Sequence, residues 1–151
     1  HNFVELERDL SNLESYVGLN ELRLAQQDQL SFEINKDDGS YFIAPLLLLS
    51  FVENAFKYGV SNVKSSPIII QIKVNEGQLY FHCQNSIPDH QRDRLDQHHI
   101  GIANTRKRLN LFYPDQHELI IAESQQQFIV DLRINLRQPN RTLIQSQNLK
   151  I

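Results

Sequence analysis

Two pairs of alternating segments constrain the fold of this chain more than any other feature. Residues 68–74 and 78–85 are rich in β-forming residues and are separated only by residues 75–77, Asn-Glu-Gly, so they predict a β-hairpin. Residues 118–123 and 128–136 predict a second strand pair. Strands joined as hairpins pair antiparallel, so the sequence disfavours a doubly wound parallel fold.

The segment 4–27 predicts a helix with one apolar seam, because its apolar residues recur at steps of three, four or seven. These residues are Leu6, Leu10, Leu13, Val17 and Leu24. The seam can dock on the sheet of its own domain, connect two domains, or pair with another helix in a coiled coil. We favour docking or a connector over a free coiled coil.

Other elements follow from local signals. Residues 30–35 alternate between apolar and polar and predict a half-buried strand. A helix is expected from Pro45 to near Gly59, because proline is tolerated in the first helical turn. Residues 87–99 are polar with little periodicity and suggest a lid, and residues 101–113 predict a last helix.

Helices between hairpins indicate an α+β fold, a two-layer α/β sandwich with helices packed on one face of a mixed sheet. The 151 residues, 40% of them hydrophobic, suffice for one well-buried core. The tail, residues 137–151, is polar, and we expect it to be loosely attached.

Charge and cysteine content exclude several functions. The net charge of -3 and the pI near 6.1 give no broad electrostatic footprint for nucleic acid. Cys83 is the only cysteine, so the chain has neither a disulfide framework nor a cysteine-based metal site, and a reducing compartment is expected. No apolar run approaches the ~18 residues of a spanning helix. The absence of methionine suggests that the chain is an excised fragment.

The helix beginning at Pro45 is apolar nearly all round, with four polar exceptions. Ser50, Glu53, Asn54 and Lys57 occupy positions i, i+3, i+4 and i+7, so they form one stripe on one face. Such a stripe can be the solvated side of an amphipathic helix, which is the commoner case for an isolated helix. It can also line a polar site.

A second group favours the site. The helix expected from Gly101 places Gly101, Asn104, Thr105 and Arg108 on one face, with Arg106 and Lys107 close by. A glycine at a helix start lets a phosphate approach unpaired backbone N–H groups, and basic side chains add charge-assisted hydrogen bonds. A basic surface helix with an ordinary glycine entry is the simpler alternative for this segment alone.

Three segments together resemble a known family. Residues 45–59, PLLLLSFVENAFKYG, resemble the N box of LytS/YehU-type sensor histidine kinases, and residues 101–109, GIANTRKRL, resemble their later glycine box. Residues 6–23 look like the helix that precedes the N box in this family. The resemblance extends from about residue 4 to residue 136.

The resemblance implies a Bergerat-type ATP-binding fold with ATP and Mg²⁺ as cofactors. By position, Asn54 would ligate Mg²⁺, Lys57 would contact the phosphates, and Glu53 could act as a general base. Tyr58 would lie at the edge of the nucleotide, and the amide oxygen of Asn85 would accept a hydrogen bond from adenine. The remaining expected nucleotide-binding residues are Gly101, Asn104, Arg106 and Arg108. Ile87 and His99 stand where the family usually has glycine.

The implied function is transfer of the ATP γ-phosphoryl group to a histidine on a separate dimerisation domain. Residues 1–27 would connect to that upstream domain, and residues 28–136 would form the catalytic domain, inactive as a kinase when alone. The implied protein is a homodimer anchored in the inner membrane, with this domain in the cytoplasm and a response regulator, of LytTR type, as partner. The alternatives are a degenerate nucleotide-binding or dimer-interaction module, or another Bergerat-fold ATPase or serine kinase.

Overall fold

The computed structural model describes residues 2–24, 29–59, 67–87 and 95–138. Its centre is a five-stranded mixed sheet in the order β2-β4-β5-β7-β6. The strands are β2 (Leu30–Lys36), β4 (Ile68–Asn75), β5 (Gln78–Ser86), β6 (His117–Glu123) and β7 (Gln127–Asn135). Only β2 and β4 pair parallel, and both expected hairpins, β4–β5 and β6–β7, are present.

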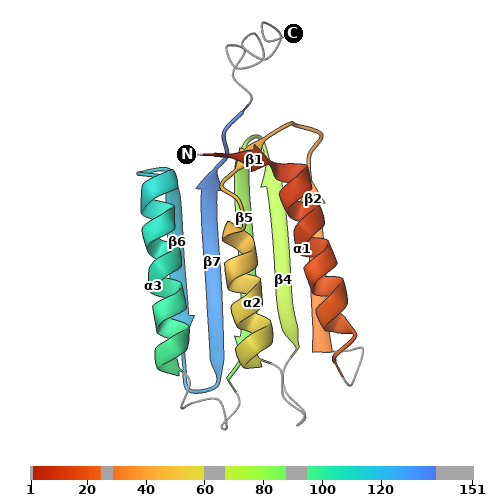
Figure 1. Ribbon diagram of the computed structural model, residues 1–151, viewed down its shortest axis with the longest axis vertical. Helices are drawn as coiled ribbons and strands as arrows, with labels where there is room; N and C mark the ends of the chain where they lie inside the picture. Colours follow the sequence, from red (N-terminus) through yellow and green to blue (C-terminus); the bar gives the residue numbers. More distant parts are fainter. Residues whose placement is uncertain (1, 25–28, 60–66, 88–94, 139–151) are drawn as a thin grey trace, which may run out of the picture.

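Three helices, α1 (Leu6–Glu21), α2 (Leu47–Gly59) and α3 (Leu95–Phe112), lie side by side on one face of this sheet, as Figure 1 shows. Two short strands, β1 (Val4–Glu5) and β3 (Phe42–Ile43), pair antiparallel at one end of the domain. The expected two-layer sandwich, with helices on one face of a mixed sheet, is therefore confirmed.

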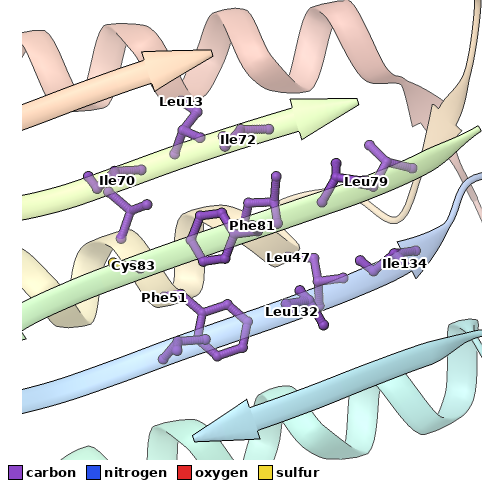
Figure 2. Close-up of a cluster of buried hydrophobic side chains, with 14 of the residues drawn as sticks. Leu13, Leu47, Phe51, Ile70, Ile72, Leu79, Phe81, Cys83, Leu132 and Ile134 are labelled. Atoms are coloured by element: carbon purple, nitrogen blue, oxygen red, sulfur yellow. The ribbon is translucent and has the colours of Figure 1, made fainter. Parts of the chain in front are cut away.

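The core lies between the sheet and the helices because the strands alternate. In β4 the side chains of Ile70 and Ile72 are buried, whereas the intervening Gln71 is exposed on the open face. Figure 2 shows these isoleucines meeting side chains of the neighbouring strands and of the helices above. The rings of Phe51, on α2, and Phe81, on β5, lie 5.8 Å apart between their centroids.

Helix α1 uses its apolar seam to dock on its own domain. Leu6, Leu10, Leu13 and Val17 are all buried in the same hydrophobic cluster as the sheet. The helix is shorter than residues 4–27, because Val4 and Glu5 pair with β3 and the helix ends at Glu21. Because α1 packs on its own domain along one side, one apolar seam is enough to bury that side of the helix.

Helix α3 begins six residues before the position expected from the sequence, at Leu95 instead of Gly101. The expected lid is therefore wrong for residues 95–99, which are helical, while residues 88–94 lie outside the described part of the chain. The first turns of α3 carry the exposed residues Gln97, His99 and Ile100. Residues 95–99, Leu-Asp-Gln-His-His, show no apolar periodicity in the sequence, so the pattern missed this start of the helix.

The beginning of the C-terminal tail is attached, contrary to expectation. The backbone N–H of Phe42 donates to the carbonyl of Arg137 at 2.8 Å. The guanidinium of Arg137 also lies over the ring of Phe3, 4.2 Å from its centroid. These contacts hold residues 137 and 138 against the small sheet, and residues 139–151 lie outside the described part of the chain.

Across the described residues, no helix combines the length and the apolar character that crossing a membrane requires.

Candidate functional site

The polar stripe of α2 faces away from the sheet. Glu53 and Lys57 are exposed, and Ser50 and Asn54 are half-buried. The opposite side of the same helix, which includes Phe51, is buried against the sheet. The stripe is thus the solvent-facing side of an amphipathic helix, and its function depends on what lies next to it.

Asn54 lies next to Gly101 of α3. A Cβ atom placed on Gly101 would be 3.5 Å from the Asn54 Nδ2 atom, an ordinary van der Waals distance, so the amide lies directly beside the glycine. The side chain of Asn54 forms no hydrogen bond with any residue in the described part of the chain. The hydroxyl of Thr105, one turn along α3, is buried and donates to the Gly101 carbonyl at 3.0 Å.

The helix start expected at Gly101 is wrong. Because α3 begins at Leu95, Gly101 lies in the second turn, beyond the N–H groups that a helix start leaves unpaired. Nucleotide binding by Gly101 stays a prediction. Asn104 and Arg106 are exposed on α3.

Arg108 is tied to the start of α2. Its Nη2 atom donates to the carbonyl of Pro45 at 2.5 Å, across 63 positions of sequence. The Asp9 carboxylate, from α1, accepts a hydrogen bond from the neighbouring Leu46 N–H at 3.1 Å. Leu46 has a φ of 60°, in the left-handed region that a leucine rarely occupies. Residues of α1 and α3 therefore hold the turn from which α2 begins.

Sequence reasoning missed Asp9, which is a buried carboxylate with 6% exposure. Burial raises the pKa of Asp9, while the Leu46 N–H and the charge of Arg108 act in the opposite direction. A signal was present, because an aspartate lies beside Leu10 on the apolar face of an otherwise regular seam. Its partner could not be identified from local pattern.

Asn85 lies at the end of β5, against the end of α2. Its side chain is 2% exposed, and its Nδ2 atom donates to the Ser86 carbonyl at 3.0 Å. A Cβ atom on Gly59 would come within 2.7 Å of the Asn85 Cβ atom, so this close approach requires glycine. The Ser86 hydroxyl beside it is buried and has no hydrogen-bond partner in the described part of the chain. An unpaired buried hydroxyl is costly and indicates a place where a ligand or water can bind.

Lys57 and Tyr58 follow Asn54 on α2. The ammonium group of Lys57 lies 5.2 Å from the centroid of the Tyr58 ring. Tyr58 itself is buried, with 2% exposure, so it supports the end of α2 from within the core.

Ile87 and His99, the two departures from the family pattern, have structural partners. Ile87 is buried, and its N–H donates to the Gln126 carbonyl at 2.7 Å. The His99 Nε2 atom lies 2.9 Å from the carboxylate of Glu123 on β6. His99 lies inside α3 and not at a helix start.

Two further observations limit where the site can lie and what it can hold. In the described ranges, no group of three histidine, cysteine, aspartate or glutamate side chains converges on a metal position. A cavity of about 480 Å³ lies on the open face of the sheet, around Tyr80 and His82, but none of the expected site residues borders it. We therefore place the candidate site on the helical face, along α2 and α3.

Comparison with known proteins identifies what the chain as a whole is similar to. No protein-family model matches the chain. Over 78 residues, 52% of its length, it is 31% identical to Sensor protein LytS of Staphylococcus saprophyticus subsp. saprophyticus, of which it spans only 13%. The resemblance to LytS-type sensor kinases is thereby confirmed.

Solved structures establish the fold. The catalytic domain of histidine kinase ThkA superposes with a TM-score of 0.60 at 13% identity, covering 92% of this chain and all of that domain. Full-length ShkA, solved in complex with AMPPNP, gives a TM-score of 0.57 at 13% identity, covering 91% of this chain and 32% of ShkA. The chain has the fold of histidine kinase catalytic domains.

Proposed function

We propose that this chain, a LytS homologue with the fold of histidine kinase catalytic domains, binds Mg-ATP and supplies its γ-phosphoryl group to a histidine of a separate dimerisation domain. The observation that carries the proposal is the unpaired side-chain amide of Asn54, which lies on the solvent-facing stripe of α2 directly beside Gly101 of α3. The sequence similarity to a sensor protein and the complex of ShkA with AMPPNP support the same function.

The adenine end of the site would lie where β5 meets the end of α2. Asn85 and Ser86 offer an amide and an unsatisfied hydroxyl there, both buried. Adenine presents donors and acceptors on its edge, so it can satisfy groups that the protein alone leaves unpaired. The glycine at position 59 permits the close approach that places Asn85 at this point.

The phosphate end would lie along the stripe. Asn54 provides an amide oxygen, a hard ligand of the kind that Mg²⁺ prefers, and the Glu53 carboxylate precedes it on the same helix. When bound there, Mg²⁺ would neutralise phosphate charge. Lys57 is exposed and can donate to a phosphate, and the exposed Asn104 and Arg106 on α3 would do so from the other side.

In the transfer itself, the bond between the γ-phosphorus and the bridging oxygen breaks, and a bond to the imidazole nitrogen forms, so that ADP leaves. The imidazole must lose a proton in this step. Glu53 would accept it as general base, because its carboxylate is exposed and open to an incoming histidine.

The context of the domain is also part of the proposal. Residues 1–27 would connect to the upstream dimerisation domain, residues 28–136 would form the catalytic domain, and residues 137–151 would form the tail. The longer protein would be a membrane-anchored homodimer that signals to a response regulator, of LytTR type, with this domain in the cytoplasm. The support is the similarity to Sensor protein LytS.

Calorimetric titration with Mg-ATP tests the proposal. We expect the wild-type chain to bind and Asn54→Ala to lose at least about tenfold in affinity, because removing a polar contact to a charged ligand costs roughly 1.5–3 kcal/mol. Asn110→Ala is the matched control, since Asn110 is an exposed amide on α3. A folded Asn54→Ala variant with unchanged affinity would refute the assignment of Asn54, and a wild type without any nucleotide binding would refute the function.

A degenerate module, which binds nucleotide without transferring phosphate, is the second candidate. One observation favours it: Gly101 lies inside α3 and offers no free helix-start N–H groups to a phosphate. Incubation of the full-length kinase with γ-labelled ATP separates the two candidates. Labelled phosphohistidine supports the kinase, whereas nucleotide binding without label supports the degenerate module.

A further inference from the structure

A cavity of about 270 Å³ lies between α1 and α2, and the nucleotide residues expected from the sequence account for only one wall of it. The wall from α2 consists of Glu53, Phe56 and Lys57, and the opposite wall consists of Tyr16, Asn20 and Arg23. From the sequence, the segment that contains Arg23 is expected to dock on the sheet or to connect two domains, and no residue of it is expected at the site. The structure places it beside two residues of the proposed site.

Helix α1 and the turn after it present an ordered wall. The ring of Tyr16 packs edge-on against Phe56, with 6.1 Å between the ring centroids. The Asn20 Nδ2 atom donates to the Tyr16 carbonyl at 2.9 Å, and the N–H of Arg23 donates to the Asn20 carbonyl at 3.0 Å. The backbone that carries Arg23 is therefore held by a closed turn.

The charges around the cavity favour an anion. Burial raises the pKa of the Tyr16 phenol, the charge of Glu53 raises it further, and the charge of Arg23 lowers it. Glu53 and Arg23 are therefore both close enough to Tyr16 to affect the same hydroxyl. Arg23, Lys57 and Glu53 form no ion pair with any residue in the described ranges. Two cations and one carboxylate leave a net positive charge in a cavity that opens to solvent.

The orientation of α1 opposes an anion at this point. The carboxyl end of a helix carries a partial negative charge and repels anions, and the last turn of α1 contains no basic residue. Arg23, two residues after α1 ends at Glu21, supplies a full positive charge that offsets this repulsion. Its planar guanidinium can donate two parallel hydrogen bonds to one phosphate.

We propose that Arg23 binds the terminal phosphate of the bound nucleotide together with Lys57, so that α1 forms part of the nucleotide site. This inference rests on the proposed function. The buried polar groups proposed for adenine, Asn85 and Ser86, lie at the Gly59 end of α2. The phosphate chain would extend from there along the stripe, and Glu53 and Arg23 would meet its terminal group.

The test compares nucleotides that differ in one phosphate. Three ligands are titrated by calorimetry: Mg-AMPPNP, Mg-ADP and inorganic phosphate. Each is titrated into the wild-type chain, Arg23→Gln and Arg23→Lys. We expect Arg23→Gln to weaken AMPPNP binding roughly tenfold or more and to leave ADP binding within about twofold, because only AMPPNP carries the terminal phosphate. Arg23→Lys keeps the charge and should retain part of the affinity.

Arg8→Gln is the matched control, because Arg8 is an exposed arginine near the other end of α1. It should bind both nucleotides like the wild type. Equal losses for AMPPNP and ADP in Arg23→Gln, or no loss for either, would overturn this inference while leaving the proposed function intact. A wild type that binds phosphate but neither nucleotide, or that binds none of the three ligands, would overturn both.

Discussion

Single side chains decide how α2 is positioned, and Asp9 shows this most clearly. It lies in the apolar seam of α1, yet its carboxylate accepts a hydrogen bond from Leu46 in the strained turn where α2 begins. Arg108 donates to the preceding carbonyl, of Pro45, from α3. Arg108 therefore acts in this structure as a positioning residue for α2, and the nucleotide contact expected for it from the sequence stays a prediction.

Substitution of Asp9 should separate its hydrogen bond from its charge. Asp9→Ala leaves the Leu46 N–H without an acceptor, so we expect a loss of roughly 1–3 kcal/mol in the free energy of unfolding. Asp9→Asn keeps an acceptor oxygen and should lose less. Urea unfolding at pH 7 measures both, and equal losses would show that the hydrogen bond to Leu46 contributes nothing.

The pH dependence carries a definite sign. The pKa of Asp9 is raised above 3.8 in the folded chain, so its contribution to stability is full below that pH and declines as pH rises through the folded pKa. Asp9→Asn cannot ionise and should lack this decline. We therefore expect the free energy of unfolding, measured by urea at several pH values above 3.8, to fall more steeply with pH in the wild type than in Asp9→Asn.

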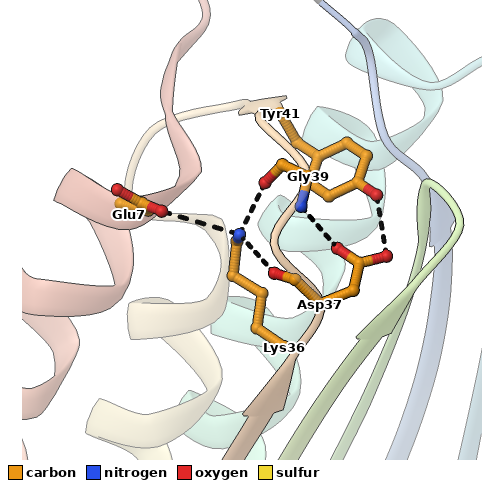
Figure 3. Close-up of polar contacts among 5 residues, drawn as sticks. All are labelled: Glu7, Lys36, Asp37, Gly39 and Tyr41. Carbon is orange, nitrogen blue, oxygen red and sulfur yellow. Dashed lines mark hydrogen bonds and ion pairs between the residues drawn. The ribbon is translucent and has the colours of Figure 1, made fainter.

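At the scale of elements, the loop between β2 and β3 joins three parts of the fold. Asp37 accepts hydrogen bonds from the Gly39 N–H, the Tyr41 hydroxyl and the Glu76 N–H, at 3.1, 2.9 and 2.8 Å. Figure 3 shows the neighbouring Lys36, which donates to the carbonyls of Asp37 and Gly39 and lies 3.6 Å from the Glu7 carboxylate of α1. The loop thus links α1, the β4–β5 hairpin and β3.

We expect Asp37→Asn to lower the urea midpoint at pH 7, because the carboxylate accepts three hydrogen bonds that an amide cannot all replace. The Glu76 N–H, first among several hydrogen bonds, lowers the pKa of Asp37 below 3.8. Its contribution is present above that pH and is lost as pH falls through the folded pKa. Asp38→Asn, an exposed neighbour, is the control. The difference in urea midpoint between the wild type and Asp37→Asn should shrink as the pH is lowered. A difference that stays the same in acid would contradict this account.

At the scale of the whole molecule, one hydrophobic core between the sheet and the helices holds the domain together. Cys83, on the central strand β5, lies inside this core, as Figure 2 shows, and is 2% exposed. Burial raises the pKa of its thiol to about 12. The thiol is therefore both inaccessible and almost entirely protonated at neutral pH.

Labelling of Cys83 should report the opening of the entire core. We expect a thiol reagent at pH 8 to react with the native chain only at the rate at which the domain unfolds, and to react at once in concentrated urea. Destabilising variants such as Asp9→Ala should label faster wherever the substitution speeds unfolding. Rapid labelling of the native wild type would show that the helices separate from the sheet without global unfolding.

The sequence by itself determined the elements whose patterns are local. The alternation in β4 and β5 and the apolar run of α2 identified the hairpin, the buried helix and the stripe that contains Glu53 and Asn54, because neighbours along a strand or helix have fixed relative directions. The start of α3 escaped detection, since the sequence of residues 95–99 is mostly polar and shows no apolar periodicity.

Only the tertiary structure decided which elements surround that stripe. It placed Gly101 opposite Asn54, joined Asp9 and Arg108 to the start of α2, and brought Arg23 to the cavity beside Glu53. These contacts join residues tens of positions apart, and neither helical nor strand periodicity relates such residues. Their proximity follows from the packing of three helices on one sheet, where burial of apolar seams sets the position of every polar side chain between them.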